Sequence, residues 1–158
     1  MNDAKTAGSG GALSAEWFES LRDATTRHAE EFRDLGFVDT RFAIRATDAA
    51  AGAPAATGLV FDTFECERVV ALQTAQDLER FDPDFVLEAP DAVWREMLEN
   101  VRRNGKADLA HTINTLVLSG ATRLSSNDQL REDLFYRYNG SLQLFFDLAA
   151  EVPSPAAA

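Results

Sequence analysis

The side chains in this sequence that could supply acid–base or nucleophilic chemistry are its 2 histidines and its single cysteine. His111 follows Asp108 by three residues, the spacing at which side chains on one side of a helix meet, and such a pair could polarise a water molecule. His28 falls on the apolar side of a helical pattern, and the sequence identifies no carboxylate or metal partner for it. Both patterns are more typical of structural contacts than of catalysis. His28, Asp108 and His111 therefore stay as candidate acid–base residues, and no catalytic residue is assigned.

Cys66 is the only cysteine, so the chain can form neither an internal disulfide nor a thiolate metal cluster. No neighbouring pattern predicts a lowered pKa for its thiol. Short catalytic and cofactor motifs are also missing. Residues 8–11 read GSGG but do not lie between a strand and a helix, and neither G-x-S-x-G nor H-E-x-x-H occurs. We predict no metal and no cofactor, and these absences favour a non-catalytic protein over an enzyme.

The net charge of −11 disfavours nucleic acids and anionic membrane surfaces as partners, because both are bound through Lys and Arg. The N-terminus shows no signal pattern, and no apolar run reaches the roughly 18 residues that a bilayer span needs. With its lone cysteine, the chain is predicted to be a soluble cytoplasmic protein without membrane insertion. Composition also predicts a single domain at residues 13–152, between a disordered leader at 1–12 and a disordered tail at 153–158.

The spacing of apolar residues predicts the elements that position these side chains. Alternation predicts strands, at residues 41–47, 57–64, 68–74, 84–88 and, as a polar edge strand, 121–128. Helical spacing predicts amphipathic helices, at residues 14–35, 90–104, 109–119 and 129–149. The polar segment 76–83 is expected to connect the third and fourth strands. Asn139 and Gly140 are a weak point that could divide the last helix.

Aromatic side chains, including 11 phenylalanines, are spread over the predicted sheet and at least two of the helices. The plain interpretation is that they fill the core, as aromatic stripes at helical spacing usually do. The sharper interpretation is that such bulky side chains do not close completely and leave an apolar pocket. The residues expected to line this pocket are Phe42, Ile44, Phe61, Phe85, Trp94, Leu98, Ile113, Leu116, Phe135, Tyr138 and Phe145.

The predicted segments follow one another in a characteristic order. They are a leading helix with a tryptophan (EWFESLRDA), a strand that runs into a helix (DFVLEAPDAVWREML), and a helix ending in LSGATRLSSND before a terminal amphipathic helix. This order resembles the sterol carrier protein type two family, in its bacterial stand-alone form. The resemblance covers about residues 14–150. It implies an α+β fold, in which amphipathic helices cover a five-stranded, mostly antiparallel mixed sheet. It also implies an apolar tunnel for lipids, fatty acyl chains or sterols, which the helix at 129–149 helps to close.

Three hypotheses about function follow. The leading one is a domain that binds or carries an apolar small molecule (a lipid, a fatty acyl chain or a sterol-like compound) by burying its surface. The second is a small cofactor-independent enzyme, such as a lyase, isomerase or hydratase, that uses the same pocket with His28 or the Asp108–His111 pair. The third is a protein-interaction or dimerisation module, in which apolar helix faces bury against another chain or a second copy.

Overall fold

The computed structural model describes residues 13–155. The predicted leader at 1–12 lies outside these residues, as do residues 156–158 of the predicted tail. The chain forms a five-stranded sheet in the order β3-β2-β1-β4-β5. β1 pairs in parallel with β4, and the remaining neighbours pair antiparallel. The α+β class and the five-stranded, mostly antiparallel mixed sheet are confirmed.

The strands lie close to the predicted ranges. They are β1 (Thr40–Ala46), β2 (Ala56–Asp62), β3 (Glu65–Leu72), β4 (Phe85–Ala89) and β5 (Arg123–Ser125). The helices are α1 (Ala15–Thr25), the 3-10 turn η1 (Thr26–His28), α2 (Ala29–Leu35), α3 (Ala75–Phe81), α4 (Asp91–Asn104), α5 (Ile113–Leu118), α6 (Gln129–Glu132), α7 (Leu134–Arg137), α8 (Asn139–Asp147) and the 3-10 turn η2 (Leu148–Glu151). None of the helices within residues 13–155 has the length and apolar character needed to cross a bilayer.

The predicted helix at 14–35 is not continuous, because α1 passes through η1 before α2 begins. Two threonines at this break hydrogen-bond back to the preceding turn. Thr25 Oγ1 donates to the Arg22 carbonyl at 2.6 Å, and Thr26 Oγ1 donates to the Asp23 carbonyl at 2.8 Å. Such back-bonding competes with the helical ladder and bends helices, which accounts for the difference from the prediction.

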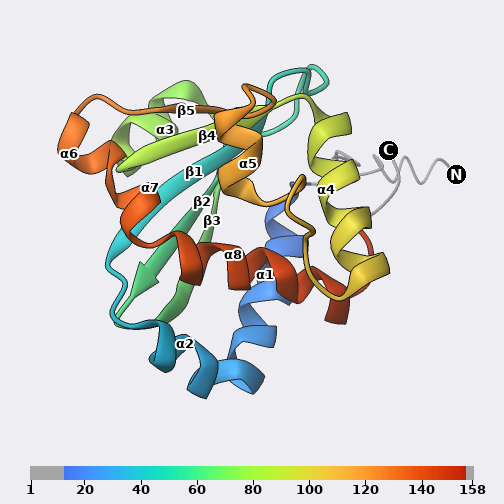
Figure 1. The fold of residues 1–158 in the computed structure, drawn as a ribbon. Helices are drawn as coiled ribbons and strands as arrows, with labels where there is room; N and C mark the ends of the chain where they lie inside the picture. The colour runs from blue at the N-terminus through green and yellow to red at the C-terminus, as the bar shows by residue number, and fades with distance from the viewer. Residues whose placement is uncertain (1–12, 156–158) are drawn as a thin grey trace, which may run out of the picture.

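The predicted terminal helix at 129–149 is also divided. The breaks between α6, α7 and α8 fall at Asp133 and Tyr138, whereas Asn139–Gly140 lies within the first turn of α8. Tyr138 has φ −104° and ψ 14°, which is outside the helical region, so the chain changes direction there. The three short helices can therefore follow the sheet in segments (Figure 1).

α3 replaces most of the connection that was predicted at 76–83. A capping box starts it: Asp77 N–H donates to Thr74 Oγ1, and Thr74 N–H donates to Asp77 Oδ2, both at 3.1 Å. The tip of its Phe81 ring meets the sheet at Gly58, where an added Cβ would stand 2.8 Å from the ring's Cζ. Glycine in β2 thus lets α3 approach the face of the sheet that the other helices leave uncovered.

The two faces of the sheet bury different amounts of apolar surface, because successive side chains of a strand point to opposite sides. The larger core lies between the sheet and the helices α1, α4 and α8, and it includes Phe42 and Leu59 (Figure 1). The smaller cluster, with Ala43 and Leu72 at its centre, is covered by α3. The larger core holds almost all of the bulky aromatic side chains.

Aromatic rings interlock at the centre of the larger core. Phe42 stacks on Phe85 with ring centroids 5.0 Å apart and on Phe61 at 6.0 Å. Phe145 of α8 meets Phe61 edge-on at 5.3 Å and stacks with Phe18 of α1 at 6.3 Å. These separations are those of favourable aromatic pairs, so the rings join the sheet to α8 and, through it, to α1.

Candidate functional site

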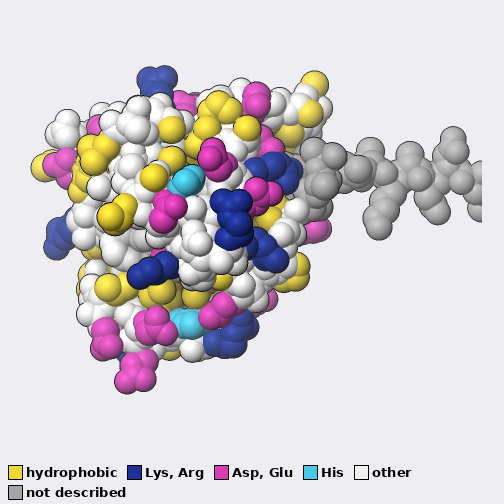
Figure 2. Space-filling model, turned by 45° about the vertical axis from the view of Figure 1, so that its right-hand side comes forward, with side chains coloured by type: hydrophobic (Ala, Val, Ile, Leu, Met, Phe, Trp, Pro, Cys, Tyr) yellow, Lys and Arg dark blue, Asp and Glu magenta, His cyan; other side chains and the backbone are white. Residues whose placement is uncertain are grey.

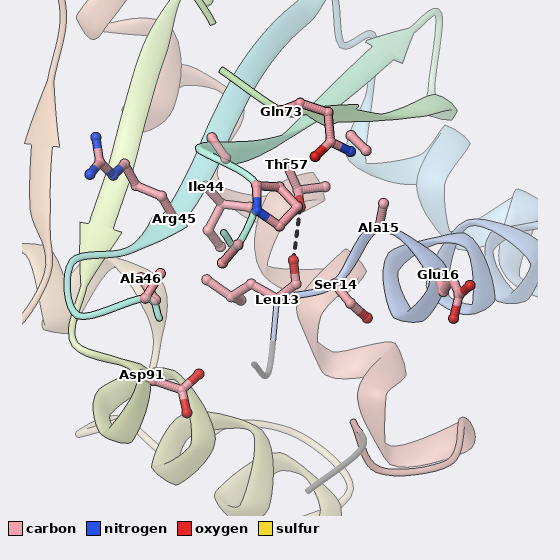
Figure 3. Close-up of a pocket in the computed structure, with 15 residues that line it drawn as sticks. Leu13, Ser14, Ala15, Glu16, Ile44, Arg45, Ala46, Thr57, Gln73 and Asp91 are labelled. Carbon is pink, nitrogen blue, oxygen red and sulfur yellow. Dashed lines mark hydrogen bonds between the residues drawn. The ribbon is translucent and has the colours of Figure 1, made fainter. Parts of the chain in front are cut away.

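A pocket of about 450 Å³ opens on the face of the sheet that α1, α4 and α8 cover. It lies where β1 and β3 end and β2 begins. The start of α1, the start of α4 and the loop 47–55 form its other walls (Figure 3). Its lining residues are Leu13, Ser14, Ala15, Glu16, Ile44, Arg45, Ala46, Ala49, Ala53, Pro54, Ala56, Thr57, Ala71, Gln73 and Asp91. Six of the fifteen are alanines, so the elements that meet here leave a hollow. Its volume is within the range of about 300–1,000 Å³ that small-molecule sites occupy.

Six of the fifteen lining residues are polar or charged, namely Ser14, Glu16, Arg45, Thr57, Gln73 and Asp91. Thr57 Oγ1 donates to the Leu13 carbonyl at 2.8 Å, which ties the segment before α1 to the sheet (Figure 3). The Gln73 amide extends from the end of β3 (Figure 3). Asp91 accepts from Arg95 Nε at 2.6 Å, so the carboxylate at the start of α4 is already paired.

Arg45 lines the pocket, but its guanidinium is directed away from Thr57 and Leu13 (Figure 3). Its side chain belongs to the opposite face of the sheet, where Nε lies 3.7 Å from Glu88 Oε2. The Arg45 carbonyl accepts a hydrogen bond from Trp94 Nε1 at 3.1 Å. A buried indole is thus bonded to the backbone of the pocket wall.

The eleven residues that the sequence predicted as pocket lining are all buried, none more than 8% exposed, and all belong to the larger core. Ile44 lines the 450 Å³ pocket, and Phe61 lines a second pocket; the other nine line neither. The structure therefore brings the predicted residues together, mainly as one packed cluster behind the pocket. The sequence analysis did not predict the six alanines that line the pocket. The alanine-rich segment 49–56 is the feature of the sequence that could have indicated them.

The second pocket, of about 380 Å³, lies at the opposite end of β1. Its polar wall is built around Asp84, which accepts from Thr40 Oγ1 at 2.7 Å and from Arg131 Nε at 2.9 Å. Arg131 also donates to Asp82 Oδ1 at 2.9 Å, and this hydrogen bond lowers the pKa of the Asp82 carboxyl. These groups satisfy one another, so they fasten α6 to the sheet rather than offer a site for a ligand.

The Asp108–His111 pair exists, in the turn before α5. His111 Nδ1 lies 2.6 Å from Asp108 Oδ1, and Asn100 Nδ2 donates to Asp108 Oδ2 at 2.8 Å. The hydrogen bond between the pair is the main cause that raises the pKa of His111 and lowers that of Asp108. Neither residue lines either pocket. The pair therefore holds the turn against α4 and lies outside both pockets.

His28 also lies away from both pockets, at the end of η1. Its Nδ1 is 2.8 Å from Glu31 Oε1 and its Nε2 is 2.8 Å from Glu151 Oε1. Acidic side chains beside the histidines are visible in Figure 2. The expectation that His28 lacks a carboxylate partner was wrong. Glu31 lies only three residues along the chain, whereas Glu151 is 123 positions away and only the fold brings it close.

We expect His28 to make stability depend on pH. Hydrogen bonds to Glu31 and then to Glu151 raise its pKa above the ordinary value. A raised folded-state pKa adds stability below the unfolded pKa of about 6.5, and that stability is lost as pH rises through the folded value. The free-energy advantage of wild type over His28→Gln should therefore be larger at about pH 5.5 than at pH 8.5. The gain should stay below about 1 kcal/mol, since solvent screens the pair.

Urea denaturation of both proteins at the two pH values measures this difference. The hydrogen bond to His28 lowers the pKa of the Glu151 carboxyl, so this partner stays ionised over the range. A difference that is constant between the two pH values, or that grows towards pH 8.5, would contradict the assignment.

Cys66 is buried, and burial raises the pKa of its thiol to about 12. The thiol therefore stays protonated at neutral pH. A protonated, enclosed thiol is a poor nucleophile, so Cys66 contributes packing rather than chemistry.

Solved structures share this fold. With the crystal structure of sterol carrier protein 2 the TM-score is 0.57 at 21% identity, covering 88% of this chain and 95% of that one. With the solution structure of a conserved hypothetical protein from Thermus thermophilus it is 0.53 at 19% identity, covering 94% and 100%. No protein-family model and no curated protein matches the sequence. The chain has a sterol carrier protein 2-like fold, which confirms the resemblance at the level of the fold.

Proposed function

We propose that this chain binds an apolar small molecule of the lipid type in the pocket between the sheet, the start of α1 and the loop 47–55. The observation that carries this proposal is a hollow of about 450 Å³ whose walls are mainly alanine with leucine, isoleucine and proline. The fold supports it, because the chain shares that fold with sterol carrier protein 2. Binding would occur by burial of the guest's surface, without covalent chemistry.

The energetics of such burial are sufficient. Apolar surface removed from water contributes roughly 25 cal/mol per Å². A guest that buries ~300 Å² would gain ~7 kcal/mol before the cost of ordering it, which is enough for micromolar binding after modest losses. The alanine walls provide this surface without strong directional contacts. Fit would then depend mainly on the length and width of the guest.

Some of the predicted lining residues would contact the ligand at the pocket wall, and others would lie behind that wall in the core. Ile44 would touch the guest directly, since it forms part of the pocket wall. Behind it, Phe42 and Phe61 stack with centroids 6.0 Å apart, so a longer guest would have to separate these rings. The fluorescence of Trp94 would change on binding, because its indole N–H donates to the Arg45 carbonyl in the pocket wall. A tunnel under α8 would then form only with a guest inside it.

The placement of the acid–base candidates favours binding over catalysis, because His28, Asp108 and His111 line neither pocket. Homodimerisation stays a separate prediction. Exposed apolar side chains such as Leu118 of α5 and Leu130 of α6 are the ones that a second copy would cover.

Identification of molecules that co-purify with the protein tests the proposed function. We expect native mass spectrometry to show a mass above that of the chain, and organic extraction to release an apolar compound. After delipidation, adding back that compound should raise the melting temperature and change tryptophan emission, since binding to the folded state stabilises it. Protein without a co-purifying compound, and without response to fatty alcohols, fatty acids, acyl-CoA or steroids, would rule out this function.

A further inference from the structure

The charges around the pocket indicate which kind of head group it accepts. Among its lining residues three are charged: Glu16, Arg45 and Asp91. The Arg45 guanidinium lies on the other face of the sheet beside Glu88. The other two, Glu16 and Asp91, carry carboxylates, and that of Asp91 is bonded to Arg95. No lining residue within the described chain therefore directs a cationic group into the hollow.

Two helices begin at the pocket, and a helix start normally attracts anions through its free N–H groups and dipole. Here a side-chain oxygen of the chain already takes one of these N–H groups at each helix. At α1, Ser14 Oγ accepts from the Trp17 N–H at 3.2 Å. At α4, the Asp91 N–H donates to Asp48 Oδ1 at 2.8 Å. Each helix also carries a carboxylate in its first turn, Glu16 in α1 and Asp91 in α4, which offsets the dipole.

Neutral hydrogen-bonding groups, in contrast, are present at the pocket. The Thr57 hydroxyl donates its proton to Leu13, so its lone pairs can still accept one. The Gln73 amide can both donate and accept. A hydroxyl head group, which donates and accepts a single hydrogen bond at low desolvation cost, matches these partners. An ionised carboxylate in the same place would lose water and gain no cation from the lining residues, because the Arg45 guanidinium lies on the other face and Arg95 is already bonded to Asp91.

We propose that the pocket selects uncharged, hydroxyl-bearing apolar molecules over fatty-acid anions of the same chain length. The proposal rests on the proposed function, because it names the ligand class for the same site. It places the hydroxyl near Thr57 and Gln73 and the apolar chain along the alanine wall towards Ile44.

Binding of 1-decanol and decanoate to delipidated protein, followed by tryptophan fluorescence at pH 8, tests the selectivity. The two ligands have equal chains, and decanoate is fully ionised at this pH. We expect decanol to bind at least about tenfold more tightly, a ratio typical of one unfavourable buried polar group. Equal affinities, or tighter binding of decanoate, would overturn the selectivity while leaving the proposed function intact. If no apolar ligand binds, both proposals fall.

A charge placed in the pocket provides a second, independent test. Gln73→Lys should reduce or reverse the preference for decanol over decanoate. The added ammonium group would give the decanoate carboxylate a cation in the pocket, so decanoate should bind more tightly. Gln129→Lys, on exposed α6 at the opposite end of β1, makes the same change in net charge and serves as the matched control. An equal shift in both variants would show that overall charge sets the preference, which contradicts a head-group site at Gln73.

Discussion

Phenylalanine in place of Ala71 should weaken ligand binding by about tenfold to 100-fold, because accommodating a guest beside an added ring costs about 1–3 kcal/mol. Ala71 lies on the edge strand β3, is exposed, and pairs with Thr57 across the strands, so its side chain shares the pocket face. Phenylalanine suits an exposed strand position, and the free energy of unfolding should change by no more than about 0.5 kcal/mol. Titration of delipidated protein with 1-decanol measures the loss.

A second variant is needed because the new ring at position 71 could point away from the pocket and leave binding unaffected. Ala53→Phe enters the same hollow from the loop and should reduce binding in the same way. Ala110→Phe adds an identical ring at an exposed turn outside both pockets and should leave binding unchanged. Unaltered affinity in both Ala71→Phe and Ala53→Phe, with folding intact, would place the ligand elsewhere.

Alanine in place of Phe145 should lower the free energy of unfolding by about 3–5 kcal/mol, the usual cost of emptying an aromatic site in a packed core. Phe145 is fully buried in α8 and touches the rings of Phe18 and Phe61. Its loss would leave a void between the sheet and two helices. Guanidinium denaturation, monitored by circular dichroism, measures the change.

Phe37→Ala is the matched control, because Phe37 is 59% exposed and its truncation should cost no more than about 0.5 kcal/mol. The comparison also separates the two interpretations of the aromatic residues. A loss close to that of Phe37→Ala would mean that Phe145 borders empty space, as the predicted tunnel would require. A loss of several kcal/mol would mean that the rings fill the centre when no guest is present.

The sequence predicted the fold best where backbone chemistry and periodicity agree. Pro90 and Gly105 bound α4 as expected, and Gly105 has φ 80°, which an L-residue with a side chain avoids. Strand pairing could also be anticipated from short turns and alternation. α3 was missed because only Leu78 and Phe81 pack from it against the sheet, too few to give a helical stripe. The signal that could have found it is the capping box that begins at Thr74.

The pocket could not be read from periodicity, because a hollow is a place where side-chain atoms are lacking. Apolar alternation shows that Phe42 and Phe85 face the same side of the sheet, but not that their rings stack at 5.0 Å and close the centre. Ala71 and Ala53 become neighbours of one hollow only after β3 and the loop are placed. The spacing of Asp108 and His111 likewise predicted the contact between their side chains but said nothing about whether a cavity lies beside them.

The loop 47–55 closes the pocket while making few contacts with the core. Backbone hydrogen bonds join its two ends to the sheet, from the Thr47 N–H to the Ala89 carbonyl at 2.9 Å and from the Ala55 N–H to the Gln73 carbonyl at 3.2 Å. Insertions and exchanges in such a surface segment cost little, because loop entropy rises slowly with length. Under the proposed function, we therefore expect variation confined to these residues to change ligand preference while the rest of the fold keeps its stability. A library that selects for altered ligand preference should therefore randomise residues 47–55.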